Sequence, residues 1–369
     1  MTAHGALPRK APDSRGRATG LRLGGLLKRL GTTVATLAAG RLAPGPWPRR
    51  APETAIKALW NSLSAAQRQE VCFDWDHCDP HRGLLRSFVA NHWQVTRPNI
   101  RSAFFTRKQQ LLIHDIFKGL LNPEWYPRFL HQLKEDTFGH EWGENQSIAI
   151  FGTPGGDRFE FIITGRHLTL RADGHTEGRV AFGGPIVYGH APSFSEGDRH
   201  PGNVFWPQAV QANKVYAMLD PRQRVRALVA TRPPEDAIEF RGPAGAFPGI
   251  PVADLYADQV QELRKTLQCL VEPFRKDDRD RVEECLRQQG GLERCSLAFY
   301  EEGTLGGGDQ WDNWRLEGPA FVWYFRGTPH VHVWVHVAND PAVPLCARNG
   351  CFLHPEHDRL GALDVTFTR

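Results

Sequence analysis

The chain has 369 residues, 41% hydrophobic and 23% charged, and this balance is typical of a globular protein rather than a disordered or fibrous one. Its formal net charge is +4, but much of the basic excess lies between Arg9 and Arg50, where acidic residues are almost absent. No stripe of basic residues interleaved with stacking aromatics follows Arg50, which argues against nucleic-acid binding.

The basic N-terminal segment, residues 1–52, has two interpretations. Its arginines and lysines precede a short apolar run, residues 32–39, as in a weak export signal. A disordered leader of a cytoplasmic protein fits the same residues, so the compartment stays open between cytoplasm and export. Closely spaced prolines up to Pro52 then mark a linker, and we expect a single domain over residues 53–369.

The first part of this domain is predicted to be helical. The clearest case is residues 106–121, where apolar side chains recur at helical spacing and Pro123 follows. A further amphipathic helix contains Tyr126 and Leu133. The remaining helices of this block are predicted over residues 54–62, 65–73 and 82–91.

From about Gln146 the pattern changes to short strands separated by Gly and Pro, at residues 147–151, 158–163 and 166–171. The Gly-rich residues 183–190 are predicted to form a loop. A second helical block covers residues 207–230, with a break at Asp220-Pro221, 258–271 and 276–289. Strands return at residues 296–300, 320–326, 330–338 and 365–368.

Two groups of strands separated by helices favour an α+β fold, with a mainly antiparallel sheet flanked by two helical blocks around a single core. We expect the last strands to join the first group in one sheet. That arrangement would bring residues near 167 close to residues near 330. No stretch approaches the roughly 20 apolar residues that cross a bilayer, so no transmembrane segment is expected.

The main functional signal is the alternating segment from His330 to His336. Successive side chains of a strand point to opposite faces, so His330, His332, Trp334 and His336 share one face and the valines share the core-facing one. Residues two apart lie roughly 6.6 Å apart along a strand, so His330 and His332 can converge on one metal ion. Trp334 and His336 are better placed to contact substrate. The alternative is a half-solvated strand that uses histidine by chance.

A metal site needs a further ligand. His167 is the first candidate, because it lies in a strand-like segment beside Gly165. His190 is the second, and otherwise a contact for substrate. Either residue could instead be a hydrogen-bonded structural histidine. Imidazole binds zinc, copper and iron alike, so these residues predict a divalent metal ion without selecting which one.

Two charged residues lie near the histidine strand in the sequence. Glu317 could ligate the ion or act as a general base, and Arg326 could hold a substrate carboxylate or other oxyanion in bidentate fashion. The alternative for both is a surface ion pair. The neighbouring aromatic residues could wall a pocket, but core packing is the simpler role.

Seven cysteines leave at least one thiol unpaired in any disulfide scheme. Two bridges are possible in an exported protein, Cys72 with Cys78 and Cys285 with Cys295, and buried free thiols are the simpler alternative. A second metal-compatible cluster is more closely spaced than known zinc modules and consists of Cys346, Cys351, His354 and His357.

Three segments carry a resemblance to a known family: Gly165-Arg-His-Leu168, Phe182–His190 and Trp323–His332. They resemble the uncharacterised bacterial family catalogued as domain of unknown function 3500, over roughly residues 53–338. Where many members have Gly-His-His-Leu, this chain has Arg166 before the second histidine. The resemblance implies no settled activity, but it implies one constellation formed by His167, His330 and His332.

The sequence lacks a Gly-x-Ser-x-Gly elbow, a Walker loop and a dinucleotide fingerprint. Our leading hypothesis is therefore a metal-dependent hydrolase or oxidoreductase acting on a small molecule, with the ion held by His167, His330 and His332. One alternative is a non-catalytic protein that binds a small ligand or a metal. Another is a purely structural or interaction protein.

Overall fold

A computed structural model describes residues 51–191, 202–302 and 311–348 of the chain. The predicted leader lies almost entirely outside these residues, as do the strand predicted at residues 365–368 and all but Cys346 of the second metal-compatible cluster. No helix within the described ranges is long and apolar enough to span a membrane.

The described residues contain eight helices, which fall into the two blocks predicted. The first block comprises α1 (Pro52–Ser62), α2 (Ala65–Val71), α3 (Arg107–Gly119) and α4 (Tyr126–Asp136). The second comprises α5 (Trp206–Met218), α6 (Pro221–Ala227), α7 (Ala257–Val271) and α8 (Lys276–Gln288). Capping boxes fix several of their first turns: Ser64, Thr106 and Asp220 each accept a hydrogen bond from the backbone N–H three residues on.

The strands form one large sheet and two small pairs. The large sheet contains β1 (Cys72–Phe73), β5 (Ser147–Gly152), β6 (Phe159–Gly165), β7 (Leu168–Ala172), β8 (Ile186–His190), β9 (Leu228–Val229), β10 (Ile250–Pro251), β11 (Ser296–Tyr300), β12 (Asn313–Gly318), β13 (Phe321–Arg326) and β14 (Val331–Val337). The small pairs are β2 (Cys78–Asp79) with β3 (Gly83–Leu84), and β4 (Phe88–Ala90) with β15 (Cys346–Arg348).

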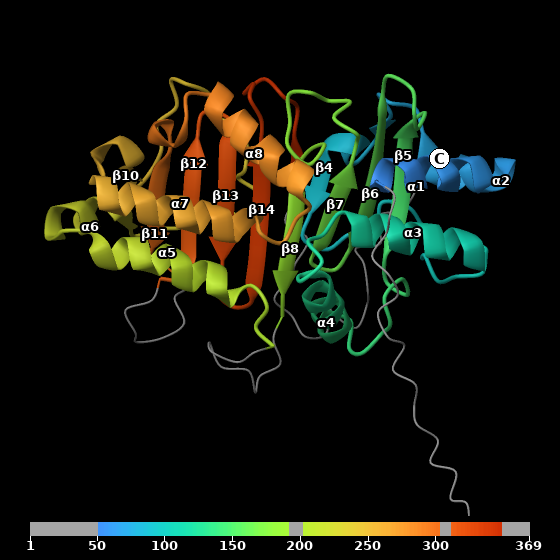
Figure 1. Cartoon of the computed structure of the whole chain (residues 1–369), viewed down its shortest axis with the longest axis horizontal. Helices are drawn as coiled ribbons and strands as arrows, with labels where there is room; N and C mark the ends of the chain where they lie inside the picture. The colour runs from blue at the N-terminus through green and yellow to red at the C-terminus, as the bar shows by residue number, and fades with distance from the viewer. Residues whose placement is uncertain (1–50, 192–201, 303–310, 349–369) are drawn as a thin grey trace, which may run out of the picture. The chain divides into compact units, whose positions relative to one another are not determined.

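The large sheet is mainly antiparallel, and its strand order is β1-β5-β6-β7-β8-β14-β13-β12-β11-β10, with β9 beside β11 (Figure 1). The fold is therefore α+β, as predicted. The last strands join the first group through β8 and β14, where Gly189 lies opposite His332 and His190 opposite Val331. This pairing joins the two groups of strands in one sheet, as the predicted histidine site requires.

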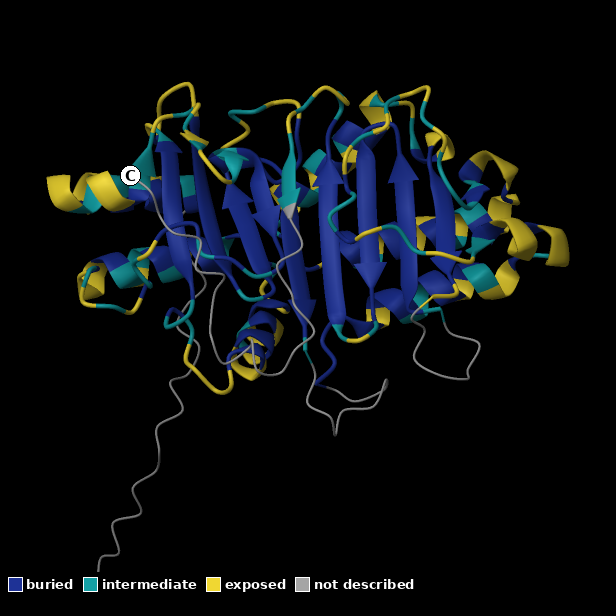
Figure 2. Cartoon of the chain, turned by 180° about the vertical axis from the view of Figure 1, so that it is seen from behind, coloured by how far each residue is buried: buried dark blue, intermediate teal, exposed yellow. Residues whose placement is uncertain are grey.

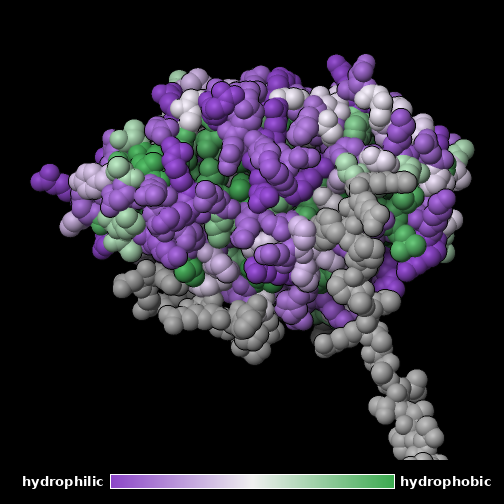
Figure 3. Space-filling model, in the orientation of Figure 1, coloured by the Kyte–Doolittle hydropathy of each residue, from purple (hydrophilic) through white to green (hydrophobic). Residues whose placement is uncertain are grey.

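The helices pack against one face of the sheet. The valines of β14 join the main core there, and α5, α7 and α8 cross the C-terminal strands on that side (Figure 1). The outer surface of these helices is mainly hydrophilic (Figure 3). Figure 2 shows that loops, rather than helices, cross the opposite face.

The histidine face of β14 is also buried. His332, Trp334 and His336 are 0% exposed, so the half-solvated strand considered above is excluded. Trp334 packs with apolar residues from β4 and from the loop before β10, such as Val89 and Ile238. Loops that cover a sheet with apolar side chains exclude water from that face as helices do.

Two secondary-structure predictions were wrong. Residues 82–91 form β3, a short 3-10 turn and β4 instead of a helix. Gly83 has φ +72° there, and all three residues of β4 are buried, which a short apolar run permits in either conformation. Residues 186–190 form β8 rather than a loop, because they fill the gap between β7 and β14. Strand β12 was not predicted.

The six described cysteines are all free thiols, so neither Cys72 with Cys78 nor Cys285 with Cys295 is bridged. Cys285 is buried, and burial raises the pKa of its thiol to about 11. A thiol with so high a pKa is a weak nucleophile near neutral pH. Cys285 therefore supplies packing rather than chemistry.

Candidate metal centre

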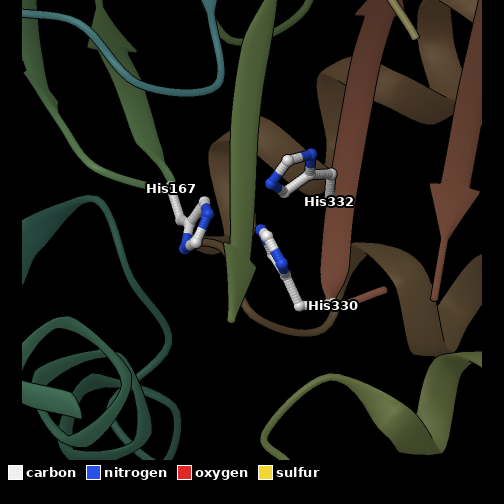
Figure 4. Close-up of side chains that lie close together, drawn as sticks. All are labelled: His167, His330 and His332. Carbon is white, nitrogen blue, oxygen red and sulfur yellow. The ribbon is translucent and has the colours of Figure 1, made fainter. Parts of the chain in front are cut away.

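Three histidines from separate parts of the chain meet at one end of the sheet. His330 and His332 lie at the start of β14, and His167 immediately precedes β7. One ring nitrogen from each lies within 4.8 Å of the other two. The ring centres are 4.5 to 4.9 Å apart, and Figure 4 shows the rings close together from either side of the strand between them. The three residues that the sequence predicts to share one site therefore lie close together.

The backbone of His167 adopts an unusual conformation. Its φ is +53°, in the left-handed region that residues other than glycine rarely occupy. Its N–H donates a hydrogen bond of 2.7 Å to the carbonyl of Asn91, which holds the turn in place. Backbone strain of this kind clusters at functional sites, where the surrounding structure maintains it.

Gly189 of β8 lies between His167 and His332. It is paired with His332, and the register of β7 with β8 places it next to His167. A Cβ atom at this position would come 2.2 Å from the carbonyl oxygen of Val331, so glycine lets β8 and β14 approach closely.

A buried carboxylate orients His167. Its Nδ1 lies 2.8 Å from Oδ2 of Asp136, the last residue of α4. The same carboxylate accepts hydrogen bonds from Gln132 and from the backbone N–H of Ala191, each 2.7 Å long. With a proton on Nδ1, the lone pair of His167 is on Nε2. That Nε2 atom is buried and has no hydrogen-bond partner among the described residues.

His332 has the same arrangement. Its Nδ1 lies 2.6 Å from Oε2 of Glu235, and its buried Nε2 has no hydrogen-bond partner within the described ranges. Glu235 is held in turn by Arg326, whose Nη1 donates to Oε1 over 2.5 Å, and by Trp334, whose Nε1 lies 3.4 Å from Oε2. Both imidazoles thus direct Nε2 away from their carboxylate partners.

The environment of the three imidazoles disfavours their charged form. Burial lowers the pKa of His167 and of His332, and it lowers the pKa of His330 to about 2. The guanidinium groups of Arg166 and Arg326 lower all three further. Burial disfavours ionisation of Asp136, but its electrostatic interaction and hydrogen bond with His167, with a further contribution from His190, hold the pKa of this carboxyl below its usual range. Neutral imidazole is the form that binds metals.

The structure places the two predicted assisting residues differently. Arg326 lies opposite His332, where it donates hydrogen bonds to Glu235 and to the carbonyl of His330. Glu317 lies on β12, two strands from β14, and in register with His336. His336 is four residues beyond His332, roughly 13 Å along a strand. Glu317 is therefore not brought to the three histidines.

The residues predicted to contact substrate are all buried. His190 places Nδ1 3.4 Å from Oδ1 of Asp136, on the far side of that carboxylate from His167. His336 stacks on Phe240 with ring centres 3.9 Å apart, and Trp334 contacts Glu235. Each of these side chains is 0% exposed. His190 and Trp334 thus contact the carboxylates that orient the histidines, whereas His336 lies away from them.

The sequence analysis missed the two orienting carboxylates. Asp136 lies 31 residues before His167, and Glu235 lies 97 residues before His332. Asp136 ends a predicted amphipathic helix, and Glu235 lies in a proline-containing loop without periodicity. Neither position carries a local signal, because their contacts arise only when the chain folds.

One protein-family model, described as "Protein of unknown function (DUF3500)", matches residues 49–339. This span includes the three histidines and both orienting carboxylates. No curated protein and no solved structure matches the chain.

Proposed function

The chain belongs to the DUF3500 family of proteins of unknown function, and we propose that it is a metal-dependent enzyme whose divalent ion is held by His167, His330 and His332. One observation carries this proposal: two buried imidazoles have Nδ1 fixed by a carboxylate, while Nε2 lacks a partner in the described structure. Carboxylate–histidine pairs of this kind orient the ligands of metal sites.

Energetics supports a cation at this point. An unsatisfied buried polar atom costs about 1–3 kcal/mol, and here the unsatisfied atoms of His167 and His332 are acceptors that converge. A water molecule has two protons to donate, which is fewer than the three nitrogens that meet. One divalent ion would satisfy all three nitrogens at once.

The chemistry would depend on which metal is bound. Three neutral imidazoles leave the full charge of the ion uncompensated and a coordination position open, which suits zinc-activated water in a hydrolase or dioxygen binding by iron or copper in an oxidoreductase. Asp136 and Glu235 would hold two imidazoles in the correct tautomer. His330, the half-buried member of the three, marks the side from which a substrate would enter.

A second candidate is a non-catalytic metal-binding protein. It is favoured by the engagement of Asp136 and Glu235, because both carboxylates are tied to histidines and Glu235 is also tied to Arg326. Neither is therefore placed as a general base for a bound water. Cobalt(II) in the site would separate the candidates, since azide changes its visible absorption only where a coordination position is open.

Elemental analysis of the purified protein tests the proposal. We expect a stoichiometric divalent metal in the wild type and its loss in His330→Ala/His332→Ala. The matched control is His336→Phe, which removes a buried histidine from the same face of β14 outside the cluster. Equal metal content in the wild type and the double variant, with both folded by circular dichroism, would sink the proposal.

A further inference from the structure

One buried asparagine contacts two of the three proposed metal ligands. Asn91 directly follows β4, and its side chain is 0% exposed. Its main-chain carbonyl accepts a hydrogen bond of 2.7 Å from the N–H of His167, and its side-chain Nδ2 lies 3.2 Å from Nδ1 of His332. A single residue therefore joins the ligand before β7 to a ligand on β14.

The main-chain contact holds the strained turn at His167. The segment around Asn91 runs beside this turn: His92 forms an isolated antiparallel bridge with Arg166, and Thr169 Oγ1 lies 3.4 Å from the carbonyl oxygen of Ala90. A substitution at position 91 keeps the main-chain carbonyl. The contact of Asn91 with His332 can therefore be removed while its contact with His167 stays.

The side-chain contact acts on the ring of His332. Nδ1 of this ring lies 2.6 Å from Oε2 of Glu235 as well as 3.2 Å from Asn91 Nδ2. The χ2 torsion of histidine has broad minima, so a second contact beside the carboxylate narrows the range of ring planes. An amide suits this position because it is uncharged, and so adds no second negative charge next to Glu235.

We propose, resting on the proposed function, that Asn91 is a positioning residue that sets the separation and the relative orientation of His167 and His332 at the ion. Asp136 and Glu235 each orient one of these two imidazoles, whereas Asn91 contacts both residues. Residues that hold metal ligands in place determine how tightly, and in what geometry, the ion is bound.

Titration of cobalt(II) into the metal-free full-length protein tests this inference. The visible absorption of cobalt reports its coordination geometry, and the titration gives its affinity. Asn91→Leu keeps the size of the side chain and the main-chain carbonyl but removes the polar contact with His332. We expect the cobalt affinity to fall roughly tenfold and the absorption bands to change in position or intensity. An unchanged affinity and spectrum would overturn the inference.

Trp93→Phe is the matched control, because it breaks a hydrogen bond in the same segment. Trp93 Nε1 donates to Thr169 Oγ1 over 2.8 Å, and this bond is buried but involves none of the three proposed ligands. The control should lower the melting temperature and leave the cobalt affinity and spectrum unchanged. If Trp93→Phe alters the spectrum as much as Asn91→Leu does, the effect is a general loosening of the segment, and Asn91 has no special role.

A second variant and the wild type complete the test. Asn91→Ser stays polar but ends one bond short of the amide nitrogen, so it should show the same loss and carries the test if Asn91→Leu does not fold. A wild type that binds no cobalt defeats the proposed function and this inference with it. A wild type that binds cobalt, with both Asn91 variants matching its affinity and spectrum, defeats this inference alone.

Discussion

Two polar clusters lie on the same face of the sheet and satisfy their charges differently. The histidine cluster consists of His167, His330 and His332, and the glutamate cluster of Arg241, Arg315 and Glu317. In the glutamate cluster opposite charges meet directly: Glu317 Oε1 lies 3.0 Å from Arg315 Nη2 and 3.3 Å from Arg241 Nε. In the histidine cluster the carboxylates lie behind the imidazoles, and lone pairs converge in front.

The buried polar atoms that have no hydrogen-bond partner in the described structure also differ between the two clusters. Arg315 and Glu317 also keep atoms without partners in the described structure, but there donors and acceptors occur side by side. Water can bridge such a mixture. Among the unpartnered atoms of the histidine cluster, Nε2 of His167 and Nε2 of His332 are both acceptors, which calls for a cation. We therefore propose that the glutamate cluster is structural and that the histidine cluster is the binding site.

The largest expected effect breaks the glutamate cluster. Glu317→Leu should lower the free energy of unfolding by about 3–5 kcal/mol, because it leaves the guanidinium of Arg315 buried without its partner. Urea unfolding measures the loss. Metal content per folded chain should not change.

A double substitution tests whether the loss of stability in Glu317→Leu comes from the unpaired Arg315. Arg315→Met/Glu317→Leu should recover most of the lost stability, since replacing both partners of a buried ion pair by apolar residues is often neutral or stabilising. A double variant as unstable as Glu317→Leu would mean that Glu317 acts through something other than this pair. Loss of metal in Glu317→Leu would contradict the division between the two clusters.

The next largest expected effect is on the metal affinity of the histidine cluster. Asp136→Asn keeps the shape of the side chain but removes the charge behind His167, and we expect metal affinity to fall by about 10–100-fold. Competition with a chromophoric chelator measures this affinity. Glu317→Gln is the matched control, because it removes one buried carboxylate from the other cluster, and it should leave the affinity unchanged.

Sequence patterns sufficed, for physical reasons, to predict the fold class and the proximity of His167, His330 and His332. Alternation of His and Val between 330 and 337 fixed which side chains share a face, and the valines had to face the helices. The pairing of β8 with β14 then brought His167 to the same end of the sheet. Periodicity can establish such facts because it is a local property of the chain.

The features that could not be predicted from the sequence depend on contacts between distant segments of the chain. Asp136 and Glu235 acquire their roles only through the folded positions of a helix end and a loop. Glu317 is close to the histidines in sequence but lies two strands away from β14, so proximity along the chain was misleading. The helix predicted at residues 82–91 failed for a related reason, because its residues 88–90 pair with β15 far along the chain.

The smallest expected effect concerns His336, which shares a face with His332 but has no carboxylate behind it. Burial, with a further contribution from Arg171, lowers the pKa of His336 to about 3, against about 6.5 in an unfolded chain. Between these values the unfolded state binds a proton that the folded state does not. His336 therefore makes stability fall as pH falls, by about 1.4 kcal/mol per pH unit below about pH 6.5.

His336→Phe should remove this dependence while keeping the ring stacked on Phe240, which now lies 3.9 Å away between ring centres. Urea unfolding of chelator-treated protein at several pH values from about 7 to 4 measures it, since the metal ligands then titrate equally in both proteins. The advantage of the variant over the wild type should widen by about 1.4 kcal/mol with each pH unit below about 6.5. Parallel curves would mean that His336 is protonated in the fold, and that a buried histidine on this face needs no carboxylate to hold a charge.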